Sequence, residues 1–515
     1  MMTPWKNPEF TRHFRREMRP VRAAMTLVIP LLVCLLVMLV MRVGERDGQG
    51  RIVWHDYWND LYIGLLAVQG VVLALWCVST CGQAISSERQ LKTFDFLRTT
   101  RLNSAELLTG SVAGRPFTAY VMVAVTLPIT LLAGTAAGYA WWRVLASMGV
   151  IVVVCLTFAL FALLFSLLTE KPRIGELIAI VVAGCWAMVQ ISHAWAFRYQ
   201  NSAIPALTVL PALEKLNGYA GVAAPLPVRL FGAPIAPAMM TVFLYGTAAA
   251  WLALMLVRNL KRDREEMRLL TRWQALLLLI CVNVIFLAQV LLRGPYGFLF
   301  IGSVNADKWF QQQVQNIVSN YVVLNAVVFY LIGLAMLPSA GELKTWFREK
   351  QRSFGSYWGE NAPPIPWIAL AAASAWVVLA AVVFFYRHEA PRADWSLGWT
   401  ALRLGVLLVY ATRDVIFLQW CGITRMKSPL VKGVLLLGLY YFVVSMIAAF
   451  VQAAMGAPDS LVGYAIVTPV GALANQALLA SVQGAGAQVG IIVLLLLLIR
   501  QRFVRVSSLT APSPA

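Results

Sequence analysis

The chain has little charge for its length. Only 13% of its 515 residues are Asp, Glu, Lys or Arg, whereas an ordinary soluble domain carries about 25%. It has 23 carboxylates and four histidines, which leaves few candidates for acid–base or metal chemistry. No Gly-x-x-x-x-Gly-Lys-Ser/Thr phosphate loop occurs, so we expect no nucleotide site. We therefore expect no metal and no cofactor in this chain.

Cysteine is also scarce, and its placement excludes a disulfide framework. All seven cysteines lie in or at the ends of apolar runs. Cys77 and Cys81 share a helix face, but no histidine or carboxylate lies within one turn of them. We interpret the cysteines as small buried hydrophobes. A cleavable signal peptide is not expected, because no small-x-small site closes the first apolar run.

Hydrophobic residues are what the chain has in abundance, at 60% with a mean hydropathy of +0.72. They fall in runs long enough to cross a bilayer, which takes roughly 20 residues. Spans of this kind must be helices, because each segment has to satisfy its own backbone polar groups. We predict an all-α polytopic membrane protein with about twelve spans, near 25–43, 61–84, 116–138, 143–168, 174–197, 236–257, 273–292, 318–337, 366–386, 404–424, 429–452 and 482–499.

The basic residues behind the net charge of +19 are unevenly distributed between the two sides of the predicted membrane topology. With the N-terminus inside, the inner segments hold 29 Lys and Arg residues and the outer segments hold 12. This asymmetry is the positive-inside bias, and it predicts a protein of the inner or plasma membrane with both termini in the cytoplasm. The basic balance therefore indicates contact with lipid headgroups, and we expect no nucleic-acid partner.

Two polar segments interrupt the apolar pattern in the first half. Asn7-Pro8 opens a basic amphipathic helix, which we expect at the membrane interface. Residues 85–110 form a charged insert between two spans, where Ser87-x-x-Gln90 and Asn103-x-x-Glu106 each have the pattern of a capping box. Lipid contact gives such an insert no role, so we expect a partner in the cytoplasm to hold it.

A weak repeat relates the two halves of the chain. Ser87-x-x-x-Leu91-Lys92-Thr93-Phe94 reappears 252 residues later as Ser339-x-x-x-Leu343-Lys344-Thr345-Trp346. The same shift places the first six predicted spans near the last six. We predict two six-helix halves, residues 1–257 and 258–515, related as parallel repeats about an axis along the membrane normal.

The insert resembles the signature of ABC-2 type permeases, the membrane subunits of a class of ABC exporters. The matching positions are Ser87-Glu88-Arg89, Thr93, Asp95, Leu97, Thr100, Leu102, Glu106 and Gly110. Asn7-Pro8-x-Phe10 and the stretch 231–237 also resemble pieces of these permeases. Lys92 stands where the family pattern has Gly, Arg101 where it has Pro and Ser111 where it has Lys.

The resemblance implies a fold like that of type V ABC exporters and a coupling helix near 87–100 that docks on an ATPase subunit. That partner, in two copies per chain, would supply ATP and Mg²⁺ chemistry, so the resemblance implies no catalytic residue and no enzyme activity in this chain. A second, degenerate copy near 339–352 lacks the Glu-Arg pair, because Ala340 and Gly341 stand there. The residues implied in coupling are Glu88, Arg89, Leu91, Thr93, Asp95, Leu97, Glu106, Leu343, Lys344 and Thr345.

A few polar residues fall inside predicted spans. Arg413 and Asp414 lie deep in the tenth span, and Gln190 and Asn325 lie in two others. Charges at such depth normally face the interior of a helix bundle. These residues are candidates for the substrate path or, alternatively, for polar packing between helices.

Two other functions fit part of the pattern. A secondary transporter driven by an ion gradient also accommodates twelve spans in two parallel halves, although Asp414 is the single carboxylate deep in a predicted span. A membrane assembly or sensor subunit without transport is the third reading. The transported substrate is open: lipid-linked glycans, drugs, peptides and ions all remain candidates.

Overall fold

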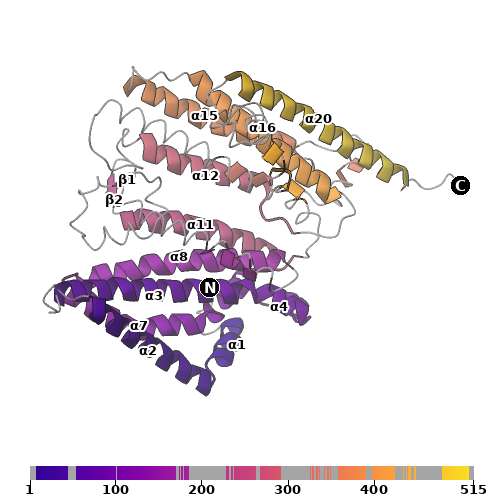
Figure 1. Ribbon diagram of the computed structural model, residues 1–515. Helices are drawn as coiled ribbons and strands as arrows, with labels where there is room; N and C mark the ends of the chain where they lie inside the picture. Colours follow the sequence, from indigo (N-terminus) through magenta and orange to yellow (C-terminus); the bar gives the residue numbers. More distant parts are fainter. Residues whose placement is uncertain are drawn as a thin grey trace. The chain divides into compact units, whose positions relative to one another are not determined.

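The computed structural model of the chain is almost wholly helical (Figure 1). Beyond scattered positions within 173–184, 325–349 and 433–447, the structure describes residues 7–44, 54–99, 101–169, 228–230, 233–235, 237–262, 267–291, 358–362, 364–389, 397–423 and 478–509. Within these residues the only strands form one antiparallel pair, β1 (Val228–Leu230) and β2 (Ala233–Ile235), in which Arg229 lies opposite Pro234.

Long apolar helices identify a membrane-embedded protein. Six helices among the described residues are long and apolar enough to cross a membrane: Pro20–Arg42, Tyr57–Gln90, Phe117–Ala136, Trp141–Leu168, Thr241–Asn259 and Gly484–Arg502. Each coincides with one of the predicted spans. The other predicted spans overlap further helices or lie wholly or partly outside the described residues, so the total of twelve stays a prediction.

Two compact units divide the chain. The first comprises Met1–Met267 with Tyr296–Gly302, and the second comprises Arg268–Pro295 with Ser303–Ala515. Each unit has its own packed helices and is described separately below. The repeat relation between the two halves of the sequence stays a prediction.

The first unit is a layer of long helices with short helices at one end (Figure 1). Helix α3 packs against α8, α7 and α2, while α11 packs on α8 and α1 packs on α6. The elements are α1 (Pro8–Glu17), α2 (Pro20–Gly44), α3 (Trp54–Gly82), α4 (Ala84–Gln90), α5 (Phe94–Thr99), α6 (Ser104–Gly114), α7 (Phe117–Ala136), α8 (Trp141–Leu168) and α11 (Pro237–Asn259).

Polar side chains within these apolar helices are bonded across helix pairs. The Gln69 amide of α3 donates to the hydroxyls of Thr126 and Thr130 on α7, at 2.6 and 2.8 Å. The Thr157 hydroxyl of α8 donates to the Tyr245 carbonyl of α11 at 3.0 Å. Hydrogen bonds of this kind hold helices together where lipid offers no hydrophobic driving force.

The second unit contains α12 (Arg272–Leu291), α15 (Ile365–Glu389), α16 (Leu397–Ile423) and α20 (Leu478–Leu509). Helix α12 packs against α15, α15 against α16, and α16 most extensively against α20. The described core of this unit is therefore a chain of neighbouring helices that ends in the α16–α20 pair.

Candidate functional site

The predicted insert folds as three short helices, α4, α5 and α6, but its first cap differs from the prediction. Helix α4 begins at Ala84, so Ser87 lies inside it and its hydroxyl donates to the Ala84 carbonyl at 3.1 Å. The cap comes instead from Ser166 on α8, whose hydroxyl accepts from the backbone N–H groups of Ile85 and Ser86 at 2.9 and 3.1 Å. The capping box at Ser87 was wrong because a tertiary contact satisfies the N–H groups of this helix.

Helix α4 ends in a Schellman motif. The Thr93 N–H donates to the Glu88 carbonyl at 3.0 Å, and the Lys92 N–H donates to the Arg89 carbonyl at 3.1 Å. This motif needs a left-handed residue at the position that Lys92 occupies, and Lys92 has φ +55°. Glycine takes that conformation without strain, and glycine is the residue that the ABC-2 pattern has there.

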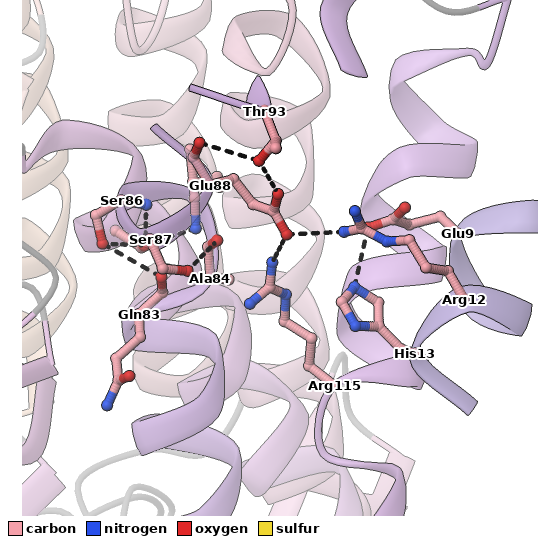
Figure 2. A network of polar contacts seen from close by, with 12 residues as sticks. Glu9, Arg12, His13, Gln83, Ala84, Ser86, Ser87, Glu88, Thr93 and Arg115 are labelled. Carbon is pink, nitrogen blue, oxygen red and sulfur yellow. Dashed lines mark hydrogen bonds and ion pairs between the residues drawn. The ribbon is translucent and has the colours of Figure 1, made fainter. Parts of the chain in front are cut away.

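Glu88 is the centre of a charged network at this end of the first unit (Figure 2). One carboxylate oxygen accepts from Arg12 of α1 at 2.8 Å and from Arg115, which follows α6, at 3.1 Å. The other oxygen accepts from the Thr93 hydroxyl. The Glu88 side chain is 11% exposed, so this carboxylate joins α1, α4 and the α6–α7 turn and faces away from solvent.

Helix α1 is docked on α6 by close backbone contact. Asn7 caps α1 as predicted, because its side-chain oxygen accepts from the Glu9 N–H at 3.0 Å. Its amide also donates to the Glu106 carbonyl at 2.6 Å. A Cβ added to Gly110 would lie 2.8 Å from the Glu9 Cβ, and one added to Gly114 would lie 2.9 Å from the His13 Cβ. The two glycines therefore admit α1.

The docked face of α1 buries two titratable groups. Glu9 accepts from Arg12 at 2.8 Å and contacts His13 at 2.9 Å, through the same oxygen. Burial by itself raises the pKa of Glu9, but His13, Arg12 and Arg115 outweigh it and lower the pKa. Burial also lowers the pKa of His13, against the opposing effect of Glu9. The lowered pKa of Glu9 favours docking at neutral pH, whereas the lowered pKa of His13 opposes docking as pH falls below the usual 6.5, where the undocked imidazole gains a proton.

The remaining predicted coupling residues of the insert divide into inward and outward groups. Arg89 donates to the Leu167 carbonyl at 2.7 Å and lies over the Phe94 ring. Leu91 is 71% exposed, and Phe96, which was not among the predicted coupling residues, is 72% exposed. Asp95 is exposed as well. A partner that held this insert would meet Leu91, Asp95 and Phe96, whereas Glu88 and Arg89 hold the insert in place.

Other predicted coupling residues have local roles or lie beyond the description. Glu106 accepts from the Asn103 N–H at 2.9 Å, as the capping-box pattern predicts. Thr345 lies in a helical position and is exposed. The side chain of Leu97, together with Leu343 and Lys344, lies outside the described residues.

The second unit has a comparable ionic contact. Arg268, just before α12, forms an ion pair with Glu342 at 2.7 Å and one with Glu360 at 3.3 Å. In both units an arginine that precedes the first apolar helix therefore bonds to a carboxylate of the insert region. The paired residues do not follow the 252-residue shift, since that shift relates Arg268 to Arg16.

Arg413 and Asp414 form a buried pair in α16. Asp414 accepts from Arg413 Nε at 2.8 Å, and the Tyr441 hydroxyl bonds both partners, at 2.6 Å to Arg413 and 2.5 Å to Asp414. Arg413 also donates to Tyr440 at 3.2 Å and to Gln488 of α20. This bonding is what polar packing requires, and it uses the groups that a substrate would otherwise contact.

Sequence reasoning missed the partners of Glu88. Nothing in the sequence singles out Arg12 or Arg115 among many arginines, whereas the spacing of Gly110 and Gly114 is a small-x-x-x-small pattern that could have indicated a docked helix.

Of the predicted intramembrane residues, Asn325 is buried in the second unit and Gln190 lies outside the described residues. Across the part that the structure describes, no group of three or more His, Cys, Asp or Glu side chains could hold a metal ion.

No protein-family model, curated protein or solved structure matches the chain.

Proposed function

We propose that the chain is the membrane-spanning permease subunit of an ATP-driven exporter of the ABC-2 type, located in the cell membrane with the insert in the cytoplasm. A separate ATPase subunit would supply ATP hydrolysis. The observation that carries the proposal is the α4–α5 turn, where the residues that resemble the family signature form a hydrogen-bonded corner. The left-handed Lys92 stands at the signature's glycine position and gives that glycine a physical reason.

The proposal gives this corner two roles, one for the signature residues and one for two side chains that lie between signature positions. Glu88 and Arg89 bind to Arg12, Arg115 and the end of α8, so they hold the corner against the first unit. Leu91 and Phe96 are left outward on the same corner. In the proposed mechanism these two side chains enter a groove on the ATPase, and its closure pushes the corner and moves α8 and α3 with it.

The test uses the tagged full-length chain purified from its own membranes. We expect a P-loop ATPase to co-purify with it, and Leu91→Ala with Phe96→Ala to weaken that association at least tenfold. Burial of each side chain stabilises a complex by about 1.5–3 kcal/mol, and 1.4 kcal/mol is a tenfold change in affinity. The reconstituted complex should lose substrate-stimulated ATP turnover in parallel.

The matched control is Leu132→Ala with Phe243→Ala. These side chains are also exposed on the isolated chain, at 68% and 41%, but lie within candidate spans. We expect this pair to leave ATPase association unchanged. Wild-type association of the Leu91 and Phe96 variant would exclude the insert as the coupling element. Transport driven by an ion gradient without any ATPase would instead favour a secondary transporter.

A further inference from the structure

The exposed face of α1 is a row of arginines. Arg12, Arg15 and Arg16 lie on α1 at intervals of three and four residues, Arg19 follows just after the end of the helix, and all four are exposed. Residues with this spacing lie on one side of a helix. The opposite side is occupied, because Phe10 packs edge-on against Phe117 at 5.7 Å between ring centroids. Helix α1 thus has one face fixed to the protein and one basic face turned outward.

This basic face lies at the end of a candidate span. Helix α1 ends at Glu17, and the apolar segment Pro20–Arg42 begins three residues later. Val21 and Met25, in its first turns, are 68% and 55% exposed, as expected of side chains that face lipid. A helix joined so closely to the start of a span lies at the level of the lipid headgroups.

Carboxylates of the protein neutralise little of the positive charge of these arginines. Arg12 pairs with Glu9 and Glu88. Within the described residues, no carboxylate forms an ion pair with Arg15, Arg16 or Arg19. Guanidinium groups bind phosphate through paired hydrogen bonds, and basic residues next to a membrane are attracted to anionic lipids.

We propose that the arginine face of α1 binds the headgroups of anionic phospholipids, and that Arg12 links this face to Glu88 of the insert. Arg12 suits the link because its guanidinium bonds to Glu88 at 2.8 Å while the side chain remains 43% exposed. Lipid bound at Arg15, Arg16 and Arg19 holds α1 at the membrane, and the Arg12–Glu88 bond passes that restraint to α4. Anionic lipid thereby steadies the insert. The inference does not depend on an ATPase partner.

The experiment places the purified full-length chain in nanodiscs of phosphatidylcholine alone or with phosphatidylglycerol. We expect phosphatidylglycerol to raise Tm and to slow hydrogen exchange in residues 8–17 and 84–99. Arg15→Gln with Arg16→Gln and Arg19→Gln should remove both effects, and should weaken retention of phosphatidylglycerol at least tenfold. The Tm of this variant in phosphatidylcholine reports whether it is folded.

Three comparisons decide the outcome. Arg500→Gln with Arg502→Gln alters two exposed arginines toward the C-terminus of α20 and should keep the effects of phosphatidylglycerol. Loss of these effects in this variant too would overturn the proposal in favour of general charge attraction. Inorganic phosphate in phosphatidylcholine nanodiscs should have no effect; equal stabilisation would indicate a free-anion site instead. Glu88→Gln should keep lipid retention but lose the slowed exchange in 84–99, and unchanged protection there would overturn the link.

Discussion

Lys92 shows how one backbone angle explains a sequence pattern. A left-handed residue at this corner satisfies the last carbonyls of α4 and brings Thr93 back to Glu88. In the folded state, a residue with a side chain at φ +55° costs roughly 1–2 kcal/mol relative to glycine. Glycine in turn loses more conformational entropy on folding, which offsets part of this difference. The chain tolerates this cost at the corner that carries the Glu88 network.

Lys92→Gly should therefore stabilise the protein by about 0.5–1 kcal/mol, because it relieves the left-handed strain. The measurement is thermal unfolding of the purified chain in detergent. Lys92→Ala is the matched control, since it removes the charge but keeps the Cβ, and we expect it to leave the free energy of unfolding nearly unchanged. Equal stabilisation by both substitutions would point to charge rather than backbone strain.

Between elements, one buried ion pair connects α16 with α20. Asp414 is fully buried and Arg413 is nearly so. Their hydrogen bonds reach Tyr440, Tyr441 and Gln488, and so connect α16 with α20. A buried pair is weak evidence of net stability, but removal of one partner leaves an uncompensated charge. A substitution that removes one partner therefore distinguishes the two roles: a packing role predicts a loss of stability, and a role in the substrate path predicts a loss of transport.

Arg413→Met should destabilise the second unit by about 3–5 kcal/mol, because Asp414 would lose its main partner in a buried environment. Arg413→Met combined with Asp414→Leu should recover a large part of that loss, since no unpaired charge remains. Thermal unfolding in detergent measures both. A stable Arg413→Met protein that has lost transport would show instead that the pair contacts substrate.

At the scale of the whole molecule, the predicted topology follows from charge asymmetry together with span length. The predicted arrangement puts both termini and the insert on the cytoplasmic side of the membrane. The structure adds that Asp95 is exposed on the insert, so a probe on the correct side can reach it.

A cysteine at position 95, in a chain whose own cysteines are replaced, should react with a membrane-impermeant maleimide in inside-out vesicles and resist it in intact cells. A cysteine at exposed Trp141, at the other end of the α7–α8 hairpin, is the control and should show the reverse pattern. Labelling of position 95 from outside intact cells would reverse the topology and place the insert away from any cytoplasmic ATPase.

Much of the architecture could be predicted from the sequence, because its causes are local. Apolar runs of span length predicted the six membrane-spanning candidates, since lipid requires each segment to satisfy its own backbone. The Asn7 cap and the Glu106 capping box could also be predicted, because each joins residues two or three positions apart. The predicted helix start at Ser87 was wrong because the cap is not local: Ser166 on another helix supplies it.

The candidate site was decided by tertiary structure. From the sequence, Glu88, Arg89 and Asp95 are equally plausible surface charges on one short helix. Their roles separate when α1, α8 and Arg115 pack around α4, because Glu88 is buried between two arginines and Arg89 bonds to the end of α8, whereas Asp95 stays exposed. Local pattern thus determined a membrane protein with a capped polar insert, and long-range packing decided which charges hold that insert and which side chains it presents.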